Sequence, residues 1–151
     1  MITLKLQGFQ QAKETLIKEL GKFNNLGTAT VGVHEGAGVH PNGDGETFAE
    51  IAIKNHFGSG NIPARPFLDV GVEEVIPQIN RTFEREMKKS GDATKALKQM
   101  AGVALDGVIN RIDNTYTPPN APYTIKMKGS SHPLIDTSQM RKSISFEIVE
   151  K

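Results

Sequence analysis

The sequence predicts an α+β domain in which a small, mostly antiparallel sheet packs against several helices, with two long flexible loops. Three observations predict this class. Apolar and polar residues alternate in three short segments, and apolar residues recur at helical spacing in four longer ones. Two segments rich in glycine or proline interrupt this order. A chain of 151 residues can bury one core, so we expect a single domain over residues 1–151.

The N-terminal part of the chain predicts a strand, a helix and a second strand. Residues 2–6 alternate between apolar and polar, as a half-buried strand does, and residues 9–23 have the spacing of an amphipathic helix. Residues 28–34 alternate again and predict the second strand. The glycine-rich residues 35–46 follow, and we expect them to form a mobile loop.

A well-marked helix start follows this loop. Thr47 and Glu50 match a capping box, and Gly58 is expected to end the helix as a left-handed C-cap. The next stretch, NIPARPFLDVG, contains two prolines that favour extended backbone. Its last apolar residues, within 67–70, therefore predict a short edge strand.

Two long helices are predicted next. The first is expected between Val72 and Met87, where Pro77 either kinks the helix or occupies its true first turn. Ser90, Gly91 and Asp92 are expected to end it and to cap the second helix, whose apolar stripe is Leu97, Met100, Ala101, Ala104, Leu105, Val108 and Ile112.

The C-terminal part of the chain predicts one long loop and one strand. Residues 116–133 are rich in proline, glycine and serine and are expected to form the second mobile loop. Residues 144–148 alternate between apolar and polar and predict the final strand. The first and final strands could pair with each other or with the second strand.

Composition and charge limit the functions that this chain can have. The net charge is +1, so the molecule as a whole is not strongly attracted to nucleic acid or to anionic membranes. The absence of cysteine excludes a disulfide scaffold and thiolate catalysis. No apolar run approaches the roughly 20 residues of a membrane span, and the N-terminus does not resemble a signal peptide. We expect a protein that is folded in a cytoplasm and has no membrane partner.

One alternative function is metal-dependent hydrolysis. His34, His40 and Asp44 lie in or beside the glycine-rich loop and are candidate metal ligands. No two histidines share a helix turn, so exposed loop residues are the simpler interpretation. GAGVHPNGDG matches no phosphate-binding motif, and no G-x-S-x-G motif occurs. We therefore expect no enzyme activity and no cofactor.

A second alternative is a DNA-contacting accessory protein. Lys126, Lys128 and Lys142, with Tyr123 and Arg141 nearby, form a weak basic patch beside an aromatic side chain. Such a patch predicts an affinity for DNA that falls steeply with salt. At a net charge of +1, a solvated loop is the simpler interpretation.

Two segments carry a more specific signal. FAEIAIKNHFGSGNIPARPFLDVG (48–71) and APYTIKMKGSSHPLIDTSQMRKSISFEI (121–148) together cover about a third of the chain. They resemble, in the same order, two signature segments of the tail completion and head–tail joining (neck) proteins of tailed bacteriophages. Related virion morphogenesis and minor tail proteins share these signatures. Ser138 and Met140 stand where the family pattern more often has glycine and leucine.

The resemblance implies a structural protein rather than an enzyme. Such proteins form a homo-oligomeric ring at the tail–neck junction, around a lumen for DNA, and bind neck, tail or tail-terminator proteins. The implied location is the virion, after assembly in the cytoplasm of the bacterial host. Arg65, between two prolines, is expected to bind a carboxylate of a neighbouring subunit, and Phe67 to anchor this segment to the core. The candidate interaction residues are Arg65, Phe67, Tyr123, Lys126, Lys128 and Arg141.

Three further expectations concern the C-terminal segment. Ser138 in place of glycine suggests that a left-handed turn is not essential at this position. Asp136 and Gln139 are expected to form a capping box for a one-turn helix. Removing residues 116–131 is expected to leave a folded monomer that cannot complete virions.

Overall fold

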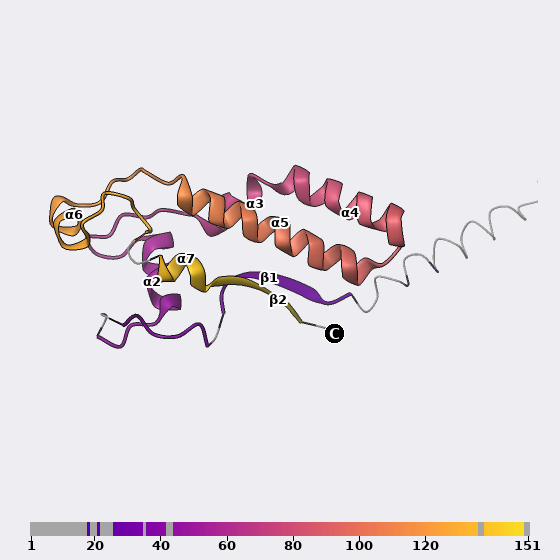
Figure 1. Ribbon diagram of the computed structural model, residues 1–151, viewed down its shortest axis with the longest axis horizontal. Helices are drawn as coiled ribbons and strands as arrows, with labels where there is room; N and C mark the ends of the chain where they lie inside the picture. The colour runs from indigo at the N-terminus through magenta and orange to yellow at the C-terminus, as the bar shows by residue number, and fades with distance from the viewer. Residues whose placement is uncertain are drawn as a thin grey trace, which may run out of the picture.

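The computed structural model in Figure 1 is a small α+β fold built around one long helix, α5 (Ala93–Asp113). It describes residues 18, 21, 26–34, 36–41, 44–135 and 138–149. Helix α4 (Ile76–Ser90) lies along α5 as the other arm of a helical hairpin, and a two-stranded sheet lies on another side of α5. The strand predicted at residues 2–6 and nearly all of the helix predicted at 9–23 lie outside the described residues.

The sheet pairs strand β1 (Thr28–Val33) with strand β2 (Ile144–Val149) in antiparallel register. Thr28 lies opposite Val149, and Val33 lies opposite Ile144. The final strand therefore pairs with the second predicted strand, which is one of the two pairings that the sequence left open. The predicted alternation is confirmed, because Ile144 is buried in the core while its neighbour Ser145 is exposed.

Helix α2 (Phe48–Phe57) begins with the predicted capping box. The Glu50 amide donates to Thr47 Oγ1 at 3.2 Å, and the Thr47 amide donates to Glu50 Oε2 at 2.8 Å. Gly58 ends the helix as predicted, but its φ of +81° and ψ of 156° lie outside the left-handed helical region. A glycine is needed there because a Cβ would lie 2.9 Å from the amide nitrogen of Ala64.

The predicted edge strand at 67–70 is wrong, because these residues lead into helix α3 (Leu68–Glu73). The helical turn presents Gly71 to α5, where a Cβ on Gly71 would lie 2.7 Å from the Cα of Val108. This tertiary contact is what selects a helix over a strand. The extended backbone that the prolines favour ends before α3.

The single helix predicted from Val72 to Met87 is in fact divided between α3 and α4, which are separated at Glu74 and Val75. Pro77 lies in the first turn of α4, the second of the two predicted alternatives. A proline lacks the amide donor that a continuing helix needs and clashes with the preceding turn, so a new helix starts there.

The turn between α4 and α5 follows the prediction. Gly91 has a left-handed φ of +64° and donates its amide to the Met87 carbonyl at 2.9 Å. Asp92 caps α5 by accepting from the Lys95 amide at 3.0 Å. The buried face of α5 consists of Ala93, Ala96, Ala101, Ala104, Gly107, Val108 and Ile112, so the predicted stripe is confirmed only in part.

The segment predicted to be irregular contains a helix, α6 (Pro122–Lys128), and a second short helix, α7 (Gln139–Ser143), precedes β2. Pro122 at the first turn and Gly129 at the left-handed C-cap are helix signals that the loop prediction overlooked. Ser138 has a left-handed φ of +61°, so the expectation that no such turn is needed there is wrong. Asp136, the predicted cap, lies outside the described residues.

The core lies where α2, α7, β2 and the C-terminal half of α5 meet. Its buried members are Phe48, Ala52, Phe67, Val108, Ile112, Leu134, Met140 and Ile144. Phe67 is fully buried, which confirms that it anchors the proline-rich segment. A search of the described helices found none that is long and apolar enough to cross a membrane.

Candidate assembly site

The two segments that carry the phage resemblance fold against each other, and Arg65 of the first binds the residues that lead into the second. Its Nε donates to the carbonyl of Pro118 at 2.7 Å, and its Nη2 donates to that of Pro119 at 3.0 Å and to Asn120 Oδ1 at 3.4 Å. The amide of Arg65 donates to the Asn55 carbonyl at 2.8 Å. One residue therefore ties α2 to residues 118–120.

This position corrects the expectation that Arg65 projects toward a neighbouring subunit. Its side chain is only 4% exposed, and its hydrogen-bond partners are carbonyl and amide oxygens of its own chain. In an extended segment, residues two apart project on the same side, and Phe67 points into the core. Arg65 is therefore directed inward. Burial lowers the pKa of Arg65, because desolvation disfavours the charged form.

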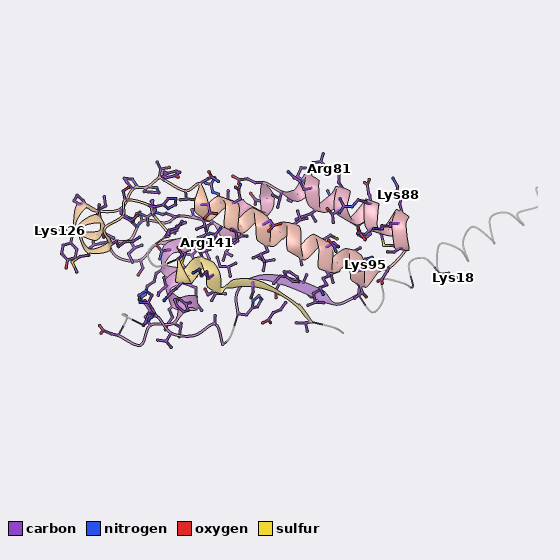
Figure 2. The ribbon with its side chains drawn as sticks, in the orientation of Figure 1. Lys18, Arg81, Lys88, Lys95, Lys126 and Arg141 are labelled. Carbon is purple, nitrogen blue, oxygen red and sulfur yellow. The ribbon has the colours of Figure 1, made fainter. Side chains whose placement is uncertain are left out.

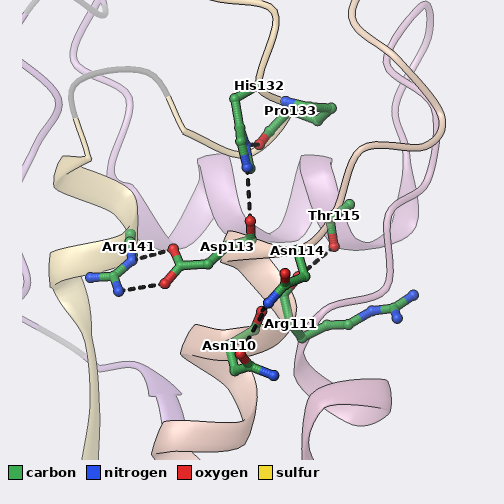
Figure 3. A network of polar contacts seen from close by, with 8 residues as sticks. All are labelled: Asn110, Arg111, Asp113, Asn114, Thr115, His132, Pro133 and Arg141. Atoms are coloured by element: carbon green, nitrogen blue, oxygen red, sulfur yellow. Dashed lines mark hydrogen bonds and ion pairs between the residues drawn. The ribbon is translucent and has the colours of Figure 1, made fainter.

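A second polar network ties the end of α5 to the segment after α6 and to α7 (Figure 3). His132 Nε2 lies 2.9 Å from the carbonyl oxygen of Asp113. The Asp113 carboxylate accepts from Arg141 Nε at 2.6 Å and from Arg141 Nη2 at 2.7 Å, a bidentate pair. This hydrogen bonding to Arg141 lowers the pKa of Asp113. Arg141, a candidate interaction residue, is therefore paired within the chain.

Residues 120–132 are closed into a loop around α6. Asn120 Nδ2 donates to the carbonyls of Ser131 at 3.4 Å and His132 at 3.3 Å. Lys128 Nζ donates to the same His132 carbonyl at 3.2 Å, and the ring of Tyr116 packs on that of His132 with centroids 4.7 Å apart. These contacts connect α6 to the rest of the fold through the two ends of the loop that carries it.

A cavity of about 430 Å³ lies between α2, the proline-rich segment and residues 120–128. Arg65, Asn120 and Lys128 contribute to its lining, as do Asn55 and Gln139. Gln139 Oε1 is buried without a hydrogen-bond partner in the described part of the chain. The cavity is thus bounded by both of the family-like segments.

Helix α6 itself faces solvent. None of its seven residues, all of which are described, is buried. Tyr123 is 74% exposed and Met127 is 69% exposed, and Lys126 lies between them in the sequence. Figure 2 places Lys126 at one end of the molecule and Arg141 further inside. Of the six candidate interaction residues, Tyr123 and Lys126 are the two that project outward, whereas Lys128 is half-buried.

The geometry gives little support to a metal site at His34, His40 and Asp44. The ring of His34 is engaged by Thr30 Oγ1 at 3.0 Å and by Ser145 Oγ at 2.9 Å. The ring of His40 packs edge-on against Phe48, and Asp44 is exposed. Across the described ranges, no group of three or more histidine, aspartate or glutamate side chains could hold a metal ion.

The basic patch proposed for DNA is also dispersed. Lys126 and Lys142 are exposed, but they lie on α6 and α7, and Lys128 is held by the His132 carbonyl.

Comparison of the chain with protein-family models, curated proteins and solved structures finds no match.

Proposed function

We propose that this protein is a structural component of a tailed-phage virion, a tail completion or head–tail connector protein that forms a homo-oligomeric ring at the tail–neck junction. The observation that supports this most is the exposure of α6. A short helix with no buried residue is held by Pro122, Gly129 and the loop around it, and it presents Tyr123 and Met127 to solvent. Such a helix adds little to the core and is suited to contact a partner.

The chemistry of the site favours binding over catalysis. The charged groups beside α6 are used to hold backbone and neighbouring helices, as Arg65 does with two carbonyls and Arg141 with Asp113. The side chains that face solvent are of the kinds enriched in protein interfaces, an aromatic residue and a methionine. Residues of both segments that resemble phage signatures line the cavity beside α6.

The proposed partners follow from this assignment. They are further copies of the same chain in the ring, and the neck, tail or tail-terminator proteins on either side of it. DNA passes through the lumen, and the protein is located in the virion. The proposal includes no cofactor, no catalytic residue and no membrane partner.

Electron microscopy of assembly intermediates tests the proposal. The coding sequence is deleted from the phage or prophage that carries it, and tails and DNA-filled heads are purified from the lysate. We expect unjoined heads and tails. When the purified protein is added back to these tails, we expect rings at one end of them. Infectious, fully joined particles from the deletion strain would overturn the proposal, as would absence of the protein from wild-type virions.

Point variants are better reagents here than the deletion of residues 116–131. That deletion removes the three acceptors of the buried Arg65 guanidinium, so we now expect it to destabilise the fold. The double variant Tyr123→Ala, Met127→Ala alters only exposed side chains and should fold normally but fail to restore joining. Val149→Ala, also at an exposed apolar residue, is the matched control and should restore joining fully.

A further inference from the structure

We propose that α6 of one copy binds the junction between α3 and α4 of the next copy, with Lys126 paired to Glu73 and with Tyr123 and Met127 packed on Ile76. This inference rests on the proposed function, because it names the contact that would build the ring. It is carried by complementary charge and by exposed apolar side chains on both surfaces.

The α6 surface is basic and apolar. Its charged residues are Lys126 and Lys128, and it contains no acid. Lys126 is exposed and has no acidic partner in the described part of the chain. Tyr123 and Met127 are four residues apart, so they lie on the same side of the helix. The surface is therefore a pair of apolar side chains beside a lysine that no acid of the described residues neutralises.

The surface at α3 has the opposite charge. Helix α3 and its C-cap contain Asp69, Glu73 and Glu74 and no base. Asp69 lies 3.6 Å from His56 Nε2, and Glu74 accepts from Arg111 at 2.9 Å. Glu73 is exposed and makes no polar contact among the described residues. Within the part of the chain that the structure describes, the Glu73 carboxylate of this acidic helix is thus without a cationic partner.

The packing of α3 directs Glu73 outward. Gly71 contacts α5 backbone to backbone, and Glu73 follows it by two residues, or about 200° around the helix. Ile76 is the first residue of α4, three residues after Glu73, and is 46% exposed. An unpaired acid and an exposed isoleucine therefore lie close together in the chain, matching the cation and the apolar pair on α6.

The placement of the two surfaces makes the contact head-to-tail. Figure 1 shows α6 at one end of the molecule, whereas α3 lies against α5 away from that end. Two different surfaces that bind each other give a heterologous interface, which repeats until a ring closes or a filament forms. The apolar contacts supply affinity, and the Lys126–Glu73 pair sets orientation and excludes wrong pairings.

Site-directed cross-linking tests whether the surfaces meet. The natural chain has no cysteine, so the variants Lys126→Cys and Glu73→Cys each carry one reactive thiol. After mixing, a short bismaleimide should join the two variants into dimers, and a chain with both substitutions should give a ladder of multimers. In the control, Lys126→Cys is mixed with Lys98→Cys, a variant at an exposed lysine of α5, in place of Glu73→Cys. Equal cross-linking of the control, or no cross-linking of the test pair, would overturn the inference.

Charge exchange tests the pairing itself. Lys126→Glu alone and Glu73→Lys alone place like charges together, and each should lower the fraction of sedimenting oligomer by about three- to tenfold. The two changes in one chain should restore it, because each interface then regains an opposite pair. Lys98→Glu should have no effect. Single variants that assemble like the natural chain, or a double variant that is not restored, would contradict the pairing.

The two proposals fail in different ways. If rings still cap tails when Lys126 is reversed, the interface is elsewhere while the proposed function stands. If the natural protein forms no ring on tails and is absent from virions, the proposed function fails irrespective of what these variants do.

Discussion

Replacing Gly107 with alanine should destabilise the fold, although alanine is the better helix former. Helices α3 and α5 cross where Gly71 and Gly107 face each other, and each helix approaches the backbone of the other. A Cβ on Gly107 would lie 2.6 Å from Val75 Cγ2 and would also overlap the Gly71 carbonyl oxygen. Because part of the obstacle is backbone, a side-chain rotation cannot relieve it, and the two helices must move apart.

The size of the effect follows from two opposing contributions. Alanine in place of glycine within a helix adds about 1 kcal/mol of stability. Overpacking of a close contact costs about 1–3 kcal/mol, and the backbone obstacle places this case in the upper part of that range. The net loss is therefore about 1–2 kcal/mol, or a fall in melting temperature of roughly 2–8 °C for a chain of this size.

Gly102, five residues earlier in α5, is the matched control. A Cβ there would meet nothing within 4 Å, so Gly102→Ala keeps the gain in helix propensity without the clash. We expect it to raise the melting temperature by about 2–4 °C. Urea unfolding followed by circular dichroism measures both variants. If Gly107→Ala is as stable as Gly102→Ala, the close approach of α3 to α5 is wrong.

Three further predictions concern the site. Arg65→Met should lower the free energy of unfolding by about 3 kcal/mol, because the carbonyls of Pro118 and Pro119 lose the charged donor that the buried Arg65 supplies. Urea denaturation measures this, and a loss below that of an exposed-lysine substitution would contradict it. Ser138→Gly should raise stability by about 1 kcal/mol, because it relieves a left-handed backbone, and an unchanged or lower melting temperature would argue against that conformation. The pair with Arg141 lowers the pKa of Asp113 in the folded state, so its stabilisation is complete above about pH 4 and is lost as the pH falls through the folded pKa. The difference in melting temperature between the natural chain and Asp113→Asn should accordingly be constant near neutral pH and shrink in acid; a difference that acid leaves unchanged would refute this.

Features that depend on a few neighbouring residues were predictable from the sequence. The capping box at Thr47, the helix end at Gly91 and the cap at Asp92 are all confirmed, because each satisfies backbone groups within one turn of itself. The alternation of β2 was also predictable, since one face of a strand must be buried. Phe67 as the anchor of the proline-rich segment is confirmed for a similar reason, because a large apolar side chain is expected in the core.

Features that depend on distant residues were not predictable in this way. The helical state of α3 is selected by the approach of Gly71 to α5, which no local pattern records. The inward direction of Arg65 could have been inferred from its spacing to Phe67, but its acceptors at Pro118 and Pro119 are more than fifty residues away. The helix α6 was overlooked because the polar composition of its surroundings outweighed the signals at its two ends.

The pairing of β1 with β2 has a consequence for the order of folding. Strand β1 begins at Thr28, which pairs with Val149 of β2. The sheet therefore cannot form until the chain between these two strands has been synthesised. The α4–α5 hairpin needs only a short turn and can form early, whereas loop closure between the strands is slow. An isolated two-stranded sheet is at best marginally stable, and these strands gain their support from α5. Until β2 is available, the side of α5 that contacts β2 in the native fold lacks that strand.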